Sequence, residues 1–244
     1  MKIEIKNLSK KFNTILAVNN LNFTIEKNTT IGLLGPNGCG KTTSIGMMLG
    51  LIKPSSGQVI IDNKDINKID RYKTLSKINF ASPYVELPKK LTVAQNLEVY
   101  ARLYGVKNFK DRIAEISEEL DLNIFLNKKT GELSSGQKNR VSLAKSLINK
   151  PQVLFLDEPT ASLDPDIGDF VRNYIQNYKS KNEITILLAS HNMNEVEKLC
   201  DSVIMMKAGK IVDSGKSTDL IKKHGRTNLE ETFLKIARSK NELV

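Results

Sequence analysis

The pattern of apolar and polar residues predicts strands and helices that alternate along most of this chain. Two segments near the start alternate between apolar and polar side chains, which is typical of half-buried strands. Longer apolar runs further along are continuous, as expected of strands that are buried on both faces of a parallel sheet. The predicted strands are 2–8, 21–26, 30–34, 59–61, 78–81, 153–156 and 184–189.

A helical pattern replaces the strand pattern between about residues 84 and 150. Apolar residues recur there at helical spacing and form two stripes. The stripes comprise Val93, Leu97, Tyr100 and Tyr104, and then Ile113, Ile116 and Leu120. The sequence therefore predicts one α/β domain over 1–244, with a core of about 1–83 and 150–220, a helical subdomain at 84–149 inserted in it, and a C-terminal extension at 221–244.

Composition narrows the class of protein only slightly. The chain has 244 residues, which suits one α/β domain, and a formal net charge of +10, which favours an anionic partner. A nucleotide, a nucleic acid and a membrane surface all fit that charge, and the lysines are scattered. The two cysteines form no framework, so free thiols are expected. We expect no signal peptide, and no apolar run approaches the ~20 residues of a membrane span.

A glycine-rich loop lies between the predicted strand at 30–34 and a predicted helix at 42–49. Its sequence, Gly35-Pro36-Asn37-Gly38-Cys39-Gly40-Lys41-Thr42, matches the pattern G-x-x-x-x-G-K-[ST]. Glycines permit the tight turn that directs several backbone N–H groups at one anion, and the helix N-terminus adds further donors. Lys41 supplies a positive charge for the phosphates, and the Thr42 hydroxyl is a ligand for Mg²⁺. The loop is therefore predicted to bind a nucleotide.

Two acidic residues, Asp157 and Glu158, directly follow the apolar run at 153–156. Buried carboxylates are costly unless they serve a cation or a water molecule. In a chain with a phosphate-binding loop, Asp157 is predicted to be a Mg²⁺ ligand and Glu158 to polarise an attacking water. His191 follows the run at 184–189 in the same way. Because ligands bind at the carboxyl ends of strands in such sheets, we expect these three side chains to lie near one phosphate group.

Two further segments allow more than one interpretation. Phe12 is suited to stacking on a nucleotide base and also to an ordinary strand end. The residues Leu133-Ser134-Ser135-Gly136-Gln137 precede a predicted helix. Ser134 or Ser135 fits the N-cap of that helix, and the same segment fits a second anion site at a helix N-terminus. Taken alone, these five residues favour the cap.

The motifs and their order resemble those of the ATP-binding subunit of ABC transporters over nearly the whole chain. Gly35 to Thr42 is similar to the Walker A motif of that family, and Leu133 to Gln137 to its LSGGQ signature. Val153 to Glu158 resembles the Walker B motif with its catalytic glutamate. Ser162-Leu163-Asp164 is similar to the D-loop, and His191 to the H-loop histidine.

The resemblance implies a fold and a set of ligands. The fold is α/β, a P-loop NTPase core with a mostly parallel sheet, an N-terminal antiparallel β subdomain and an inserted α-helical subdomain. The ligands are ATP and Mg²⁺. Phe12 takes the place of the adenine-stacking aromatic, Gly35 to Thr43 bind the phosphates, and Thr42 and Asp157 hold Mg²⁺, Asp157 through water. Glu158 and His191 are the implied catalytic residues.

The same resemblance implies a head-to-tail homodimer. Each nucleotide then lies between the Walker A motif of one subunit and the signature of the other. Ser134 and Gly136 are the signature residues implied to touch a γ-phosphate across the interface. Ser135 replaces a glycine that the family usually has at this place.

One position departs from the family pattern. The family has a glutamine after the strand that corresponds to 78–81, where it contacts Mg²⁺ and couples to the membrane partner. In this chain Pro83 falls at that position, with Ser82 before it. Proline has no side-chain donor or acceptor, so the contact with Mg²⁺ is either missing or supplied by water or by Ser82. The departure motivates an alternative function, a regulatory module that binds ATP and hydrolyses it slowly.

Segments at 91–105 and 228–233 resemble cassettes that power exporters with a separate permease subunit. The expected location is therefore cytoplasmic, peripheral on the inner face of the cell membrane. A soluble cassette that acts on nucleic acid or the ribosome is the second alternative. Such proteins usually carry two cassettes or long coiled-coil inserts, and this chain has one cassette, so no nucleic-acid partner is expected.

Overall fold

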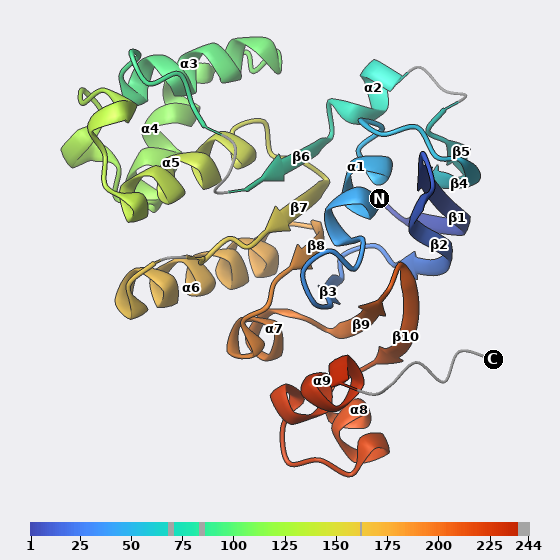
Figure 1. The fold of residues 1–244 in the computed structure, drawn as a ribbon. Helices are drawn as coiled ribbons and strands as arrows, with labels where there is room; N and C mark the ends of the chain where they lie inside the picture. Colours follow the sequence, from blue (N-terminus) through green and yellow to red (C-terminus); the bar gives the residue numbers. More distant parts are fainter. Residues whose placement is uncertain (68–70, 83–85, 162, 239–244) are drawn as a thin grey trace. The chain divides into compact units, whose positions relative to one another are not determined.

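The structure is a computed structural model in which the chain forms two compact units (Figure 1). It describes residues 1–67, 71–82, 86–161 and 163–238. The first unit comprises Met1–Thr74 and Thr185–Val244, and the second comprises Leu75–Ile184. Pro83 and Ser162, on which two of the predictions depend, lie outside the described residues.

The first unit contains both ends of the chain and most of the strands (Figure 1). Its elements are β1 (Ile3–Phe12), β2 (Ile15–Ile25), β3 (Thr30–Leu34), α1 (Lys41–Met48), β4 (Ser56–Ile61), β5 (Lys64–Asp65), β8 (Thr185–Ala189), α7 (Met193–Leu199), β9 (Ser202–Lys207), β10 (Lys210–Gly215), α8 (Ser217–His224) and α9 (Leu229–Arg238). The short helix α2 (Arg71–Leu75) ends at the boundary with the second unit.

Two sheets organise the first unit. One is antiparallel, with strand order β2-β1-β4-β5. In the other, the strands of this unit follow the order β10-β9-β3-β8, and β3 runs parallel to both β8 and β9. Every residue of β3 and of β8 is buried, as the continuous apolar runs predict. The expected combination of an antiparallel N-terminal sheet with a mostly parallel core sheet is confirmed.

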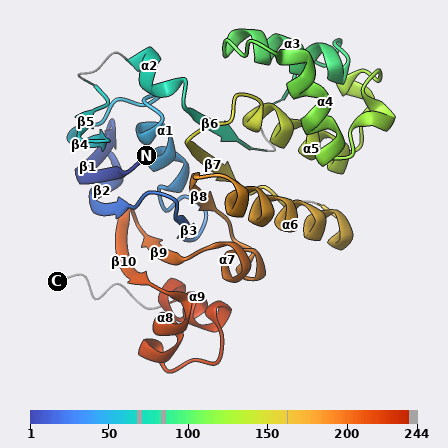
Figure 2. The same ribbon diagram turned by 180° about the vertical axis from the view of Figure 1, so that it is seen from behind.

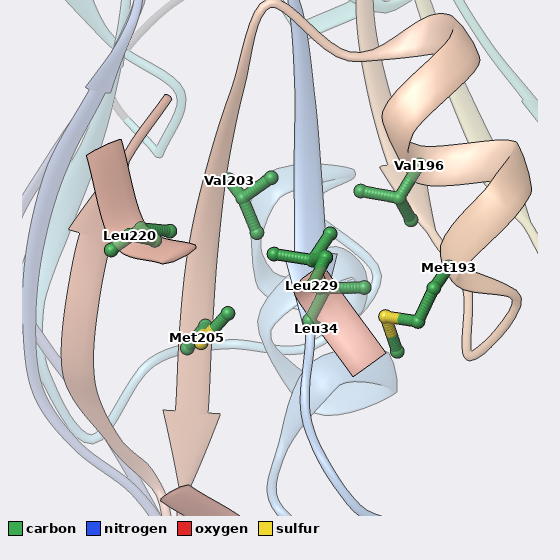
Figure 3. Packing of buried hydrophobic residues seen from close by; sticks show 7 residues of the cluster. All are labelled: Leu34, Met193, Val196, Val203, Met205, Leu220 and Leu229. Atoms are coloured by element: carbon green, nitrogen blue, oxygen red, sulfur yellow. The ribbon is translucent and has the colours of Figure 1, made fainter. Parts of the chain in front are cut away.

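An apolar cluster joins the C-terminal helices to the core of the first unit (Figure 3). Leu220 of α8 and Leu229 of α9 are buried in it together with residues of β3, α7 and β9. The other members are Leu34, Met193, Val196, Val203 and Met205. Full burial of one such side chain contributes about 1.5–3 kcal/mol, so this cluster holds α8 and α9 in place. The C-terminal extension, for which the sequence pattern predicted no element, is helical.

The second unit combines two parallel strands with several helices (Figure 2). Its elements are β6 (Ile78–Ala81), α3 (Val93–Leu103), α4 (Phe109–Glu119), two 3₁₀ turns η1 (Asn123–Phe125) and η2 (Thr130–Glu132), α5 (Ser135–Leu147), β7 (Val153–Asp157) and α6 (Pro165–Lys181). Strands β6 and β7 pair in parallel, with Ala81 opposite Leu156. Helices α3, α4 and α5 lie within 84–149, the stretch where the sequence predicts a helical subdomain.

Two helices of the second unit begin with the same device. Thr92 caps α3 and Ser134 caps α5; each hydroxyl accepts a hydrogen bond from the backbone N–H three residues later. Gln95 and Gln137 complete the two capping boxes by accepting from the backbone N–H of the cap residue. An N-cap of this kind contributes about 1 kcal/mol to stability. Because both partners of each capping box lie within four consecutive residues, the local sequence specifies where each helix begins.

The hairpin β1–β2 is longer than the sequence pattern predicts. The alternation of apolar and polar residues predicted strands at 2–8 and 21–26, but β1 continues to Phe12 and β2 begins at Ile15. The reason is a series of register shifts along the β1–β2 pair, which are β-bulges or similar irregularities. Each shift moves the following side chains to the other face, so the simple alternation is lost while the strands continue.

Candidate functional site

The glycine-rich loop follows β3 and leads into α1, in the first unit. A side chain at Gly35 would come within 2.6 Å of the Met206 carbonyl oxygen, and one at Gly40 within 2.6 Å of the Ala17 carbonyl oxygen. Gly40 also has a φ of 104°, which other residues rarely adopt. The loop therefore packs so tightly against β9 and β2 that glycine is required at both ends. Its contact with β2 at Ala17 was not indicated by any sequence pattern.

Hydrogen bonds fix the loop to its neighbours. The Gly209 N–H donates to the Cys39 carbonyl at 3.0 Å, and the Asn19 N–H donates to the Gly209 carbonyl at 2.8 Å. The Lys41 ammonium donates to the Gly35 carbonyl at 2.6 Å, so this cation lies over the loop itself. Pro36, Asn37 and Gly38 are exposed in contrast to their buried neighbours. The loop thus presents a positive charge and a helix N-terminus on a rigid support, an arrangement suited to an anion.

Cys39 is the buried member of the loop. Burial raises the pKa of its thiol, although the nearby Lys41 charge acts in the opposite direction. A raised pKa keeps the thiol neutral at physiological pH. The loop therefore carries no thiolate that would repel a phosphate.

His191 lies at the same edge of the sheet as the loop. Strands β3 and β8 are parallel neighbours, with Leu33 opposite Ala189, so their carboxyl ends meet at one edge. The chain leaves β3 into Gly35 and leaves β8 through the buried Ser190 into the exposed His191. The Ser190 hydroxyl accepts a hydrogen bond from the Asn192 N–H at 3.0 Å, which fixes the turn that carries the histidine. Within this unit, His191 therefore follows β8 at the sheet edge where the phosphate-binding loop follows β3, and its role stays a prediction.

Phe12 lies at the end of the β1–β2 hairpin, opposite Ile15. Phe12 is 44% exposed, and the Lys10 ammonium lies 4.9 Å from the centroid of its ring. The same hairpin contacts Gly40 through Ala17. An exposed aromatic ring on a hairpin that touches the phosphate-binding loop has one face available for stacking.

The acidic pair lies in the second unit. Asp157 is the last residue of β7 and is buried, with 8% of its surface exposed. Ser82, at 4% exposed, follows the parallel strand β6, whose Ala81 pairs with Leu156, so both polar residues lie at the carboxyl edge of that pair. Glu158 is half-buried and leaves the strand direction, because its φ is +52°. The direction of the Glu158 side chain is therefore set by this turn of the backbone.

The segment 133–137 forms the start of α5. Leu133 is buried, Ser134 and Ser135 are exposed, and the Ser134 hydroxyl is the N-cap described above. The N-cap interpretation of this segment is confirmed, and it leaves the exposed helix N-terminus free to face a second ligand. A side chain at Gly136 would come within 2.7 Å of the Ile167 Cδ1 atom, so glycine allows α5 and α6 to pack closely. Asp164, which is exposed, occupies the N-cap position of α6.

The sequence profile of the ABC transporter family matches residues 18–161 of the chain, from β2 to the turn after β7. This chain belongs to the ABC transporter family. It is an ATP-binding cassette with ATPase chemistry.

Several curated proteins are similar to this ABC cassette over most of its length. The ABC transporter ATP-binding protein NatA of Bacillus subtilis is 33% identical over 95% of the chain and 96% of its own length. The Nod factor export ATP-binding protein I of a Rhizobium species is 34% identical over 95% of the chain and 76% of its own length. The methionine import ATP-binding protein MetN of Staphylococcus haemolyticus is 33% identical over 89% of the chain and 67% of its own length. Relatives thus include ATP-binding subunits of both import and export systems.

A solved structure agrees with the fold. The ATP-binding cassette MJ0796, seen as a dimer in a post-hydrolysis state with ADP and Pi, matches with a TM-score of 0.80 and 27% identity, over 88% of this chain and 98% of that one. The ABC cassette described here therefore has the fold of an enzyme that has been captured with its reaction products.

The oxygen donors of this ABC cassette suit Mg²⁺. The Thr42 hydroxyl is exposed in the first turn of α1, and the Asp157 carboxylate is buried at the end of β7. Hard divalent cations prefer such oxygens, and Mg²⁺ keeps several waters and phosphate oxygens as further ligands. Within the described residues there is no group of three or more His, Cys, Asp or Glu side chains that would hold a metal ion alone. Thr42 belongs to the first unit and Asp157 to the second, and each offers an oxygen of the kind that Mg²⁺ takes.

No helix in the described part of this ABC cassette is long and apolar enough to cross a membrane.

Proposed function

We propose that the motifs of this chain bind ATP and catalyse its hydrolysis, each in the role that the resemblance to the family implies. Gly35 to Thr43 bind the phosphates, and Phe12 stacks on the adenine. Glu158 accepts the proton of the attacking water, and His191 holds the γ-phosphate and orients that water. The observation that carries the proposal is the arrangement in the first unit: the Lys41 ammonium, the start of α1 and His191 lie at one edge of the sheet. Positive charge and donors gathered there match a triphosphate.

Mg²⁺ is the proposed cofactor. Thr42 would hold it through the hydroxyl, and Asp157 would hold it through water. When bound, the ion neutralises charge on the phosphate oxygens. Asp157 suits the role because its carboxylate is an oxygen donor at the carboxyl end of β7, and ligands bind at the carboxyl ends of strands in such sheets. Ser82, buried at the carboxyl end of β6, is the residue of this chain proposed to replace the family glutamine near that ion.

We also propose that two copies of the chain form a head-to-tail dimer around two ATP molecules. The proposal is supported by the dimeric form of the relative MJ0796. It is also supported by the exposed start of α5, where Ser134 and Ser135 face away from the protein interior. The donors of a helix N-terminus suit the γ-phosphate of a nucleotide held by the other subunit.

Replacing Ser134 by arginine is expected to block ATP-driven dimerisation and to leave ATP binding by the monomer unchanged. A bulky side chain in a packed contact costs about 1–3 kcal/mol, which weakens the dimer roughly 5- to 150-fold. The measurement is the dimer fraction by size-exclusion chromatography with ATP, in a Glu158→Gln background so that ATP persists. ATP binding by the monomer is measured by titration.

The matched control for Ser134→Arg is Thr92→Arg. Thr92 is the N-cap of α3 and forms the same type of capping box, so this variant loses a cap in the same unit. It is expected to dimerise as the parent does. If Ser134→Arg instead abolishes ATP binding by the monomer, the 133–137 segment serves the nucleotide of its own chain and the dimer proposal is wrong.

The proposed biological role is to power transport, in the export direction, through a separate permease on the inner face of the membrane. The segments at 91–105 and 228–233 support this role, as does the similarity to the Nod factor export protein.

The permease proposal is tested by isolating the tagged chain from its native cells in a mild detergent. The expected result is a membrane complex that contains one partner with several apolar helices, encoded next to this chain. Recovery of the chain on ribosomes or nucleic acid, with no membrane partner, would instead favour the soluble-cassette alternative. Turnover that stays very slow even in the membrane complex would favour the regulatory alternative.

A further inference from the structure

Asn139 connects the helix that follows the signature to the segment that carries Glu158. It lies on α5, five residues after the Ser134 N-cap, and only 9% of its surface is exposed. Its side-chain Nδ2 donates a hydrogen bond to the Pro159 carbonyl oxygen at 2.6 Å. Pro159 directly follows Glu158 and is itself buried. No sequence motif had singled out Asn139.

The segment that receives this bond is an unusual turn. The Ala161 N–H donates to the Glu158 carbonyl at 3.1 Å, so residues 158–161 close a turn. Glu158 enters it with a φ of +52°, a conformation that costs about 1–3 kcal/mol for a residue other than glycine and persists only where the surroundings enforce it. The Pro159 carbonyl lies within the turn, one peptide beyond the strained residue.

A second contact holds the far end of the same segment to α5. The absence of a side chain at Gly136 allows α5 to approach Ile167, in the first turn of α6. The turn at 158–161 and the first turn of α6 are thus each held to α5. The Asn139 contact is a hydrogen bond, which is directional, and it holds the residue directly after Glu158. The Gly136 contact is close packing and lies further along the chain.

We propose that Asn139 is a positioning residue for ATP hydrolysis. By holding the Pro159 carbonyl, its side chain sets the orientation of Glu158. The inference rests on the proposed role of Glu158 as the base. Without the donor, the Pro159 carbonyl loses a partner in a buried place, and the Glu158 peptide is free to relax from its left-handed conformation. A displaced base loses turnover steeply, because a shift of about 1 Å can cost 10²-fold. ATP binding should not change, since Asn139 does not belong to the nucleotide-binding loop.

Three variants separate the hydrogen bond from the bulk of the side chain. Asn139→Leu and Asn139→Asp are close in size to asparagine and lack the donor. Asn139→Gln keeps the amide donor, and a cavity of about 310 Å³ that Asn139 itself lines has room for the extra methylene. The control is Asn79→Leu: Asn79 is also buried and donates to a backbone carbonyl of α5, that of Ser146, at 2.5 Å, at the opposite end of the helix.

The measurements are kcat and KM for ATP, an ATP-binding titration and the thermal unfolding midpoint of each variant. We expect Asn139→Leu and Asn139→Asp to lower kcat at least fivefold with KM within twofold of the parent. Asn139→Gln should keep more than half of the parent kcat. Asn79→Leu should lose comparable thermal stability and keep its kcat.

The proposal is wrong if Asn139→Leu and Asn139→Asp lose less than fivefold in kcat, or if their KM for ATP rises in parallel. It is also wrong if Asn139→Gln or the control Asn79→Leu loses as much kcat as these two variants. Failure of both donor-free variants to fold would likewise overturn it. Glu158→Gln, assayed beside them, identifies a failure of the underlying assignment. If Glu158→Gln turns over at the parent rate, Glu158 is not the base. If Glu158→Gln is inactive while the Asn139 variants are normal, only the positioning role is wrong.

Discussion

Replacing Glu158 by glutamine is expected to lower steady-state phosphate release roughly 10²- to 10⁴-fold at saturating MgATP, the range typical of a lost general base. The amide keeps the size of the side chain and its place in the turn after β7, but it cannot take a proton from water. ATP binding should therefore survive, and ATP should accumulate between two subunits. The measurements are phosphate release, an ATP-binding titration and the dimer fraction in the presence of ATP.

A suitable control for Glu158→Gln is Glu183→Gln. Glu183 is exposed and belongs to the same unit as Glu158. It lies just before β8, at the amino end of that strand, whereas Glu158 follows the carboxyl end of β7. This variant removes the same charge from the surface and should turn over normally. Unchanged turnover in Glu158→Gln would mean that another group accepts the proton.

Replacing Lys41 by alanine is expected to weaken MgATP binding about 10- to 150-fold. The change removes charge-assisted hydrogen bonds to phosphate, which are worth about 1.5–3 kcal/mol. In the structure the Lys41 ammonium is held over the loop by the Gly35 carbonyl, so the cation is already placed where the phosphates are expected. The dissociation constant is measured by titration with a fluorescent ATP analogue.

Lys27→Ala is the matched control for Lys41→Ala. Lys27 is exposed in the turn between β2 and β3, at the amino end of the strand whose carboxyl end leads into the loop. It changes the net charge by the same amount and should bind MgATP as the parent does. Binding by Lys41→Ala within twofold of the parent would rule out the phosphate-binding interpretation of the loop.

Local sequence was sufficient to predict the buried strands and the start of α5. The runs that form β3, β7 and β8 are continuous and apolar because both faces of each strand are covered. The Ser134 cap and its Gln137 partner lie three residues apart, so a short window contains the whole device. The loop at Gly35 to Thr42 was predictable for the same reason, because its geometry is fixed by glycines within it.

Features set by packing between distant segments could not be predicted. The β1–β2 hairpin was predicted too short, because register shifts move side chains from one face to the other without a consistent residue signal. The C-terminal helices fold onto β3, α7 and β9, which are far from them in sequence. The bond from Asn139 to Pro159 spans 20 positions, and asparagine is common enough on helices that nothing marked this one.

The left-handed backbone of Glu158 means that stability and activity favour different residues at one position. Glycine adopts this φ without strain and would relieve part of a conformational cost of about 1–3 kcal/mol. It would also remove the carboxylate. A search for more stable variants that scores folding alone would therefore tend to select glycine at 158 and discard the ATPase, whereas selection for growth would keep the strained glutamate. At position 158, the residue that would give the more stable protein is therefore one that would abolish catalysis.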